Sequence, residues 1–189
     1  MYLFFDTETT GLPRNWKSPV TDVNNWPRLV QLAFSVYDKE GGKILAADYI
    51  IKPEGFTIPV DASRVHGITT ERAMDEGVAL MDVLIYFQSQ IEKSQTLVAH
   101  NMSFDEKIMG AEFLRNNMQD SIATKPKLCT MLSSTKYCGI EGPYGFKWPK
   151  LTELHMRLFN HDFGEAHNAA ADIAATVKCF FELKKIGVM

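Results

Sequence analysis

The chain opens with the stretch Met1-Tyr2-Leu3-Phe4-Phe5-Asp6-Thr7-Glu8-Thr9-Thr10-Gly11-Leu12, in which an apolar run leads directly into two acidic residues. Alternate residues of a strand point to the same face and each residue advances about 3.3 Å, so Asp6 and Glu8 share one face, roughly 6–7 Å apart. Two carboxylates at the end of a buried strand repel each other, which raises the pKa of one or both. A divalent cation between them would remove this repulsion. The alternative is a strand end followed by a solvated acidic turn.

Length and composition indicate a soluble protein with a single domain over residues 1–189. Of its 189 residues, 46% are hydrophobic and 23% are charged, which is enough for one sizeable core. The net charge of −3 does not by itself indicate a nucleic-acid-binding protein. Residues 121–157 nevertheless carry six cationic and two acidic side chains, a local net charge of +4. Such a segment is either a solvated face or a surface for an anionic partner.

The cysteines and the N-terminus indicate a cytoplasmic protein. Cys129, Cys138 and Cys179 are odd in number and show no CxxC spacing, which argues against a disulfide framework or a structural zinc site. The apolar start lacks the preceding basic region of a signal peptide, and no apolar run reaches transmembrane length. We therefore expect a reduced, cytoplasmic protein that does not contact a membrane.

Strand patterns dominate the first third of the chain. Residues 2–6 form an apolar run, residues 28–37 alternate in polarity, and residues 43–52 read as a third strand. A loop over residues 13–27 and a turn over residues 38–42 connect them. These connections predict an antiparallel meander with the acidic strand at one side.

Helical patterns and two short strands alternate in the rest of the chain, which predicts an α/β fold. The expected elements are short helices over 61–66 and from Thr69 or Thr70, helices over 77–93, 103–117, 150–159 and 168–185, and strands over 96–99 and 128–131. Ser103 is expected to cap the helix that it begins. The residues expected to be buried by the helix over 77–93 are Val78, Met81, Leu84, Ile85, Gln88 and Ile91. Those of the last helix are Ile173, Val177, Phe180 and Phe181.

Two further motifs place acids beside apolar elements. In Leu97-Val98-Ala99-His100-Asn101-Met102-Ser103-Phe104-Asp105, an apolar strand ends at His100 and Asn101, and Asp105 lies in the first turn of the next helix. Ligands bind at strand ends in α/β sheets, although an acid at a helix N-terminus also stabilises the helix dipole. In His167-Asn168-Ala169-Ala170-Ala171-Asp172, small residues begin the last helix. Asp172 borders its apolar stripe, where an acid needs a partner, either a lysine or a metal.

Together, the three motifs predict a metal site. Asp6, Glu8, Asp105 and Asp172 supply about four negative charges, which two divalent cations would neutralise, and hard oxygen ligands favour Mg²⁺ or Mn²⁺. Two such ions can activate a water molecule and stabilise the leaving oxygen in an in-line displacement at phosphorus. His167 has a near-neutral intrinsic pKa and could take the proton of that water.

The same motifs resemble those of a known family. Asp6-Thr7-Glu8-Thr9-Thr10-Gly11-Leu12, His100-Asn101-x-x-Phe104-Asp105 and His167-x-x-x-x-Asp172 resemble the three exonuclease motifs of the DEDDh 3′–5′ exonucleases. This DnaQ-like family includes the proofreading epsilon subunit of bacterial replicative polymerase, RNase T and oligoribonuclease. Val65-His66-Gly67-Ile68-Thr69 resembles a further family element that lines the substrate cleft. The resemblance covers the whole chain. It implies a ribonuclease H-like fold whose mixed five-stranded sheet, a three-strand antiparallel meander plus two short parallel strands, is flanked by helices.

The resemblance also implies a role for each catalytic residue. Asp6, Glu8 and Asp172 would hold the metal ion that carries the attacking water. Asp6 would bridge to the second metal ion, and Asp105 would act largely through water. His167 would be the general base.

For the substrate, the resemblance implies a set of contacts around the 3′ end. Leu12 would wedge against the terminal base and His66 would lie near the 3′ end, and Thr9 and Asn101 complete the expected substrate-binding set. Cys129-Thr130 departs from the Asp-Thr that many members carry at this place. This position is not one of the four acids, so the departure concerns a contact behind the metal ligands.

The expected activity is the release of nucleoside 5′-monophosphates from the 3′ ends of single-stranded or frayed nucleic acid. We expect single-stranded DNA, because the opening motif and the His66 segment resemble proofreading-type members. One alternative is an RNA-trimming 3′–5′ exoribonuclease of the same family, since no residue clearly reads a 2′-hydroxyl. Another is a non-catalytic nucleic-acid-binding module on the same fold. The chain ends soon after its last helix, so no polymerase-tethering tail is expected.

One aromatic segment has two interpretations. Tyr144, Phe146 and Trp148 lie among Lys147 and Lys150. Aromatic rings beside cations can stack the bases of a single strand. The alternative is that these side chains pack within the protein.

Overall fold

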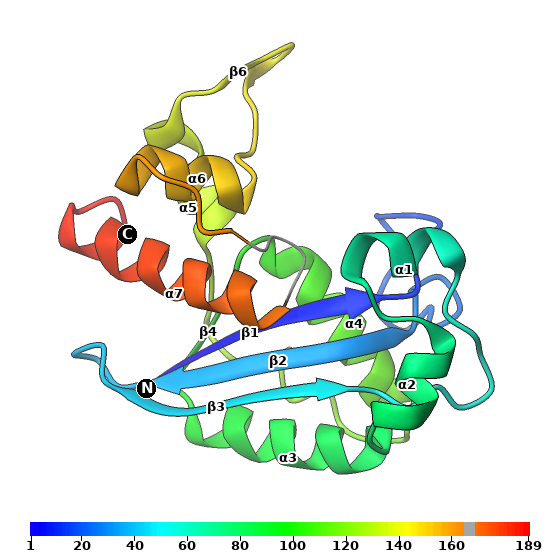
Figure 1. The fold of residues 1–189 in the computed structure, drawn as a ribbon. Coiled ribbons are helices and arrows are strands. Elements are labelled where there is room, and N and C mark those ends of the chain that lie inside the picture. The colour runs from blue at the N-terminus through cyan, green and yellow to red at the C-terminus, as the bar shows by residue number, and fades with distance from the viewer. Residues whose placement is uncertain (165–168) are drawn as a thin grey trace.

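A mixed five-stranded sheet, in the order β3-β2-β1-β4-β5, forms the centre of the computed structural model, which describes residues 1–164 and 169–189 (Figure 1). The strands of this sheet are β1 (Tyr2–Thr9), β2 (Leu29–Tyr37), β3 (Lys43–Ile50), β4 (Thr96–Ala99) and β5 (Lys127–Cys129). β1, β2 and β3 pair antiparallel, whereas β4 pairs parallel with β1 and β5 pairs parallel with β4. The predicted meander and the two short parallel strands are confirmed. The acidic strand is the middle strand of the sheet.

Helices cover both faces of the sheet. They are α1 (Val60–His66), α2 (Thr70–Glu76), α3 (Leu80–Lys93), α4 (Met102–Arg115), α5 (Thr130–Cys138), α6 (Leu151–Phe159) and α7 (Ala169–Lys185), and β6 (Glu141–Gly142) and β7 (Gly145–Phe146) form a small separate hairpin. Within the described ranges, none of these helices has the length and apolar character needed to cross a membrane. Figure 1 shows α3 and α7 on opposite sides of the sheet.

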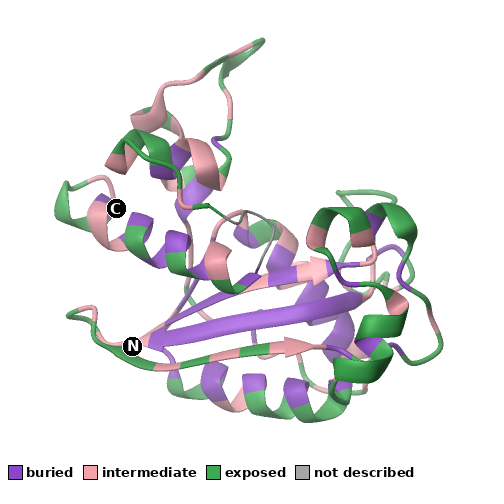
Figure 2. Cartoon of the chain, viewed as in Figure 1, coloured by how far each residue is buried: buried purple, intermediate pink, exposed green. Residues whose placement is uncertain are grey.

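Both faces of β1 are buried, each against a different layer. Phe5 belongs to the larger core cluster, which includes residues of α3 and α4, whereas Phe4 packs in a second cluster with α7. Figure 2 shows β2 buried along its length beside β1. Because successive side chains of a strand alternate between faces, Asp6 and Glu8 share the face of Phe4, which is the face that α7 covers.

The helix ends near the third strand follow the predicted signals. Gly67 ends α1 in the left-handed conformation, with φ 73°, a conformation that glycine adopts readily. Thr69 caps α2, because its hydroxyl oxygen accepts a hydrogen bond from the backbone N–H of Arg72 at 3.1 Å. These short helices follow β3 and bring His66 towards the sheet.

The buried face of α3 differs from the predicted one. The helix begins at Leu80, three residues later than expected. Its buried residues are Leu80, Val83, Leu84, Phe87, Gln90 and Ile91, and the exposed members of the predicted stripe are Val78, Met81 and Ile85. The segment carries two apolar stripes. Phe87 decides between them, because its ring packs against those of Phe5 and Phe34 at centroid distances of 5.4 and 5.2 Å.

Two predicted boundaries around the second acidic motif are wrong. Asn101, and not Ser103, occupies the N-cap position of α4, without a side-chain capping hydrogen bond and with its backbone in the left-handed conformation at φ 74°. The Ser103 hydroxyl instead donates to Asn101 Oδ1 at 3.2 Å. β5 ends at Cys129, earlier than predicted, because Thr130 begins the unpredicted helix α5. Cys129 caps this helix, since its Sγ accepts from the N–H of Leu132 at 3.5 Å.

The last helix and the hairpin differ in how they bury aromatic side chains. The predicted stripe of α7 is confirmed for Ile173, Val177 and Phe180, while Phe181 is half-buried against the same cluster. In and just after the hairpin, by contrast, Tyr144 is fully exposed, and Phe146 and Trp148 are 54% and 66% exposed. The interpretation of these three residues as core packing is therefore wrong.

Candidate active site

Three of the predicted acids converge at the junction of β1 and α7. Asp6 and Glu8 lie on one face of β1, and Asp172 lies in the first turn of α7. One oxygen ligand atom of each carboxylate lies within 4.8 Å of the others. The helix can approach the strand closely because Ala169, at its start, is fully buried in the cluster that contains Phe4. The small side chain of Ala169 thus has a packing reason.

The electrostatics of this cluster are those of like charges held together. Burial raises the pKa of Asp6 well above its ordinary value, and the negative charges of Asp105, Asp172 and Glu8 raise it further. The pKa of Glu8 rises to about 8, mainly through burial and then through Asp172 and Asp105. A cation bound between these carboxylates would relieve the repulsion.

The donor set fits a hard divalent cation. All three converging groups are carboxylates, and Mg²⁺ and Mn²⁺ prefer oxygen ligands over the sulfur and nitrogen ligands typical of zinc. The ligand atoms are already close, so binding a cation requires little rearrangement. The residues present therefore fit the metal site that the sequence predicts.

Asp105 joins the site from α4, at the edge of β1 that pairs with β4. The β1–β4 ladder ends at the pair Phe4 and Val98, so the next part of β1 has no strand on that side. There, Asp105 Oδ1 accepts hydrogen bonds from the backbone N–H of Thr7 at 3.1 Å and from its hydroxyl at 2.8 Å. Burial raises the pKa of Asp105 to about 7, although the Thr7 hydrogen bonds oppose this shift. Asp105 is 3% exposed and is not one of the three converging ligands.

His167, the predicted general base, lies outside the described residues. The helix that begins at Ala169 starts two residues later and carries Asp172 in its first turn. The assignment of His167 therefore stays a prediction that rests on the motif alone.

The predicted substrate contacts surround the end of β1. Leu12 is 73% exposed, just beyond Gly11, whose φ of 142° suits glycine. The Thr9 hydroxyl donates to the carbonyl of Gly11 at 2.6 Å and so shapes this turn. His66 lies near the backbone of Thr9. Its pKa is lowered by partial burial, and the interaction with Thr9 opposes the shift.

Asn101 and His100 lie at the other side of the site. Asn101 occupies the N-cap position of α4 and is half-buried, so its amide can face a cleft. His100 is structural: its Nε2 is 3.0 Å from the carbonyl of Pro149, and its Nδ1 is 2.9 Å from Thr130 Oγ1. Since a carbonyl only accepts, Nε2 carries the proton and Nδ1 accepts from the hydroxyl. Burial lowers the pKa of His100 to about 4, which keeps the ring neutral.

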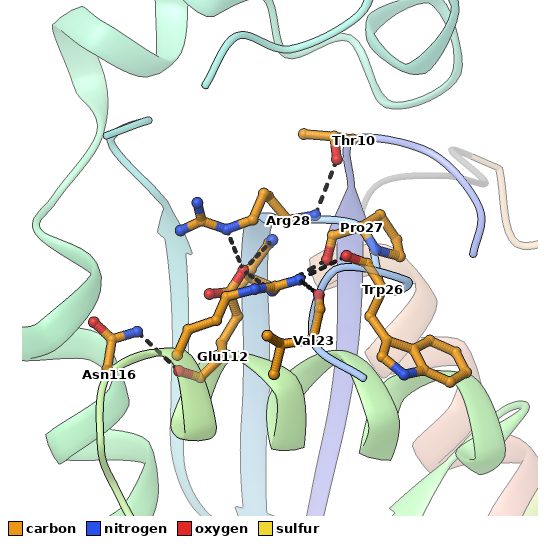
Figure 3. Close-up of polar contacts among 9 residues, drawn as sticks. Thr10, Val23, Trp26, Pro27, Arg28, Glu112 and Asn116 are labelled. Atoms are coloured by element: carbon orange, nitrogen blue, oxygen red, sulfur yellow. Dashed lines mark hydrogen bonds and ion pairs between the residues drawn. The ribbon is translucent and has the colours of Figure 1, made fainter. Parts of the chain in front are cut away.

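A buried ion-pair cluster around Glu112, which the sequence motifs do not predict, connects α4 with the turn after β1 (Figure 3). Glu112 Oε1 accepts from Arg28 Nε at 2.9 Å and from the N–H of Leu29 at 3.0 Å, and Arg115 pairs with the same oxygen at 2.9 Å. The Arg28 carbonyl also accepts from the backbone N–H of Thr10, at the end of the acidic motif, and the Arg28 N–H donates to the Thr10 hydroxyl, each at 3.0 Å. The cluster thereby ties α4, which carries Asp105, to the turn after β1.

The sequence contains a signal for Glu112 and for Thr7, neither of which the motifs identify as part of the site. Glu112 follows Asp105 by seven positions, which is two helical turns on the same face of α4. Thr7 stands between the two acids of β1, so it faces the opposite layer, where α4 lies. Neither spacing identifies a partner without the pairing of the elements.

Comparisons with known proteins agree with this architecture. The family model RNase_T, described as exonuclease, matches residues 3–180. A DNA polymerase III of PolC type from Streptococcus pyogenes is 34% identical over 130 residues, which cover 69% of this chain and 8% of that protein. An uncharacterized exonuclease of Escherichia phage 186 is 25% identical over 98% of this chain and 89% of its own length.

A solved structure has the same fold. Exonuclease I of E. coli, in complex with a dA16 oligonucleotide, matches with a TM-score of 0.77 and 20% identity, over 97% of this chain and 40% of that one. The ribonuclease H-like fold that the motifs imply is thus confirmed. The chain spans less than half of exonuclease I and a small part of the PolC-type polymerase.

The chain belongs to the exonuclease family, and the resemblance to the DEDDh exonucleases drawn from its three motifs is confirmed. The matching family model is that of an exonuclease, and the chain has the ribonuclease H-like fold.

Proposed function

We propose that this protein is a 3′–5′ exonuclease that depends on divalent cations and releases nucleoside 5′-monophosphates from single-stranded DNA. The observation that carries the proposal is the convergence of Asp6, Glu8 and Asp172, with ligand oxygens within 4.8 Å of one another. The family membership supports the nuclease class. We further propose that residues 1–189 act as one exonuclease domain.

Each acidic residue has a distinct task in this proposal. Asp6, Glu8 and Asp172 would hold the first of two divalent cations, and Asp6 would also bind the second. Asp105, which the hydrogen bonds from Thr7 hold in place, would act through water. When bound, such cations lower the pKa of water and neutralise charge on a phosphodiester. His167 would accept the proton of the attacking water.

The residues around the acidic cluster support action at the end of a nucleic-acid strand. Leu12 is exposed in the turn after β1, and His66 lies near the backbone of Thr9, the last residue of that strand. A terminal nucleotide between them would present its scissile phosphate to the acids. Exonuclease I of E. coli, which shares the fold, is known in complex with a dA16 oligonucleotide, and this supports a single-stranded DNA substrate.

Digestion of matched DNA and RNA oligomers, labelled at the 5′ end, tests the proposal. With Mg²⁺ or Mn²⁺ we expect a ladder of successively shorter DNA products, which EDTA abolishes and a 3′-phosphate strongly slows. Internal fragments that appear first, or equal rates on blocked ends, would contradict 3′–5′ direction. Faster digestion of RNA would identify an exoribonuclease. Binding without cleavage, at saturating metal, would identify a non-catalytic module.

A further inference from the structure

We propose that a cavity beside the first turn of α4 is a stacking site for an unpaired nucleobase of the substrate strand. The inference rests on the proposed function, because the base would belong to the strand whose 3′ end occupies the acidic cluster. The cavity encloses about 580 Å³, within the usual range of ligand sites. Its wall includes Trp16, Trp26, Asn101, Lys107 and Trp148.

All three tryptophans of the chain line this cavity. Trp26 is buried, with 3% exposure, whereas Trp16 and Trp148 are 51% and 66% exposed. The two exposed indoles come from segments far apart in the sequence and meet at one hollow. Every base has a π-face that can stack on an indole, so this wall suits a strand of any sequence.

Contacts to α4 hold Trp16 in place. Its ring centroid lies 5.7 Å from that of Phe104, and its carbonyl accepts a hydrogen bond from Lys107 Nζ at 3.3 Å. The same ammonium group lies 4.8 Å from the centre of the Trp26 ring. A fixed cation among aromatic rings matches a ligand that combines flat bases with a phosphate backbone. This combination distinguishes a nucleic acid strand from a purely apolar ligand.

A second set of contacts holds the backbone beside Trp148. The carbonyl of Pro149, the next residue, accepts the hydrogen bond from His100 Nε2 at 3.0 Å. His100 directly follows β4 and precedes Asn101, which occupies the N-cap position of α4. The exposed indole therefore projects from a backbone that is tied to the strand end of the second acidic motif.

The cavity lies beside the acidic cluster and not within it. Asn101 lines the cavity, and Asp105 follows it by four residues, about 6 Å along the axis of the same helix. Lys107 and Asp105 lie on different sides of that helix, about 160° apart. A strand that leaves the acids over the start of α4 would place a base in the cavity within the first few nucleotides upstream of the scissile bond.

Binding measurements in EDTA, where no cleavage occurs, test the site. We expect Trp16→Ala and Trp148→Ala each to weaken binding of a 5′-labelled single-stranded oligonucleotide about 5- to 140-fold. The matched control is Tyr86→Ala, which removes an exposed aromatic ring of α3 that does not line the cavity, and it should leave binding unchanged. Because every tryptophan lines the cavity, the oligonucleotide should also quench the intrinsic fluorescence of the unmodified protein. Wild-type affinity in both variants would overturn the proposal.

A scan of abasic positions locates the stacked base. Oligonucleotides with one abasic site at successive positions from the 3′ end should show a position at which the wild type loses affinity and Trp148→Ala does not. Equal losses in both proteins at every position would overturn the site. Trp148 is the safer variant, because Trp16→Ala also removes the contact with Phe104 and can lower stability.

A minimal substrate separates this proposal from the exonuclease activity itself. The p-nitrophenyl ester of thymidine 5′-monophosphate has no upstream base, so the tryptophan variants should hydrolyse it at the wild-type rate. If the wild type hydrolyses this ester but the variants bind oligonucleotides normally, the stacking site is wrong and the exonuclease proposal stands. If neither this ester nor an oligonucleotide is cleaved while the abasic pattern persists, the exonuclease proposal is wrong and the stacking site stands.

Discussion

Asp105 accepts two hydrogen bonds from a single residue, Thr7, one from its backbone N–H at 3.1 Å and one from its hydroxyl at 2.8 Å. This pairing occurs where β1 extends beyond its parallel neighbour β4, so the carboxylate takes the place of a strand partner. The pairing brings Asp105 near Asp6 and Glu8, although α4, which carries Asp105, packs on the other face of the sheet. The threonine between the two acids of the opening motif is thus part of the site.

Thr7→Val should lower kcat about tenfold, because Asp105 loses one of the two hydrogen bonds that orient it but keeps the backbone bond. The same loss removes an interaction that lowers the pKa of Asp105. Thr7→Ser retains the hydroxyl and is the matched control. Steady-state kinetics on a labelled oligonucleotide, with melting temperatures of all three proteins, checks the effect. A wild-type kcat in the valine variant would show that the hydroxyl has no positioning role.

Asp6→Asn and Asp172→Asn should abolish cleavage while the fold is kept, since each removes a proposed ligand and not a core side chain. In EDTA, their melting temperatures should equal or exceed that of the wild type, because a repulsive charge is gone. Asp75→Asn changes an exposed acid on α2 and is the control. Circular dichroism, thermal melts and Mn²⁺ titration calorimetry distinguish the outcomes. Near wild-type cleavage in either variant would remove that acid from the site.

The metal-free protein should lose stability as the pH rises. The folded-state pKa values of Glu8 and Asp105, about 8 and about 7, lie above the ordinary values near 4 that the unfolded chain retains. The folded state therefore binds these protons more tightly. The stability that these two groups contribute is fully present below about pH 4 and is lost as the pH rises to about 8.

Thermal melts in EDTA between about pH 5.5 and pH 8.5 test whether stability falls with pH. We expect the melting temperature to fall by several degrees over this range. Added Mg²⁺ or Mn²⁺ should raise the melting temperature more at the higher pH, because ligands bind as carboxylates. A melting temperature that rises with pH in EDTA, or a metal effect that is larger at low pH, would contradict the raised pKa values.

His167→Ala should bind Mn²⁺ and DNA normally but cleave about 10²–10⁴-fold more slowly, which is the usual loss on removing a general base. The acidic limb of the pH–rate profile should flatten in the variant, because that limb reports protonation of the base. Single-turnover rates at saturating metal, metal affinity and melting temperature separate this role from a structural one. A folded variant that cleaves at the native rate would exclude His167 as the base.

Much of the local structure, and the residue types of the site, could be predicted from short stretches of sequence. The strand pattern around Asp6 and Glu8 placed both acids on one face, and the glycine and threonine signals at Gly67 and Thr69 marked real helix ends. These features depend on backbone geometry over a few residues, which is why periodicity and capping rules detect them. The three acidic motifs likewise identified the exonuclease family, because ligand type and order along the chain are written in the sequence.

Which of these residues lie close together could be learned only from the folded chain. Asp172 comes close to Asp6 and Glu8 because Ala169 is buried against the sheet. The position of Asp105 depends on where β4 stops pairing with β1. Aromatic contacts across the core determine which face of α3 is buried. The tryptophan-lined cavity is formed by segments that no local sequence pattern connects. Such contacts are set by the packing of distant segments, whose free energy depends on all the elements at once, so no window of neighbouring residues contains them.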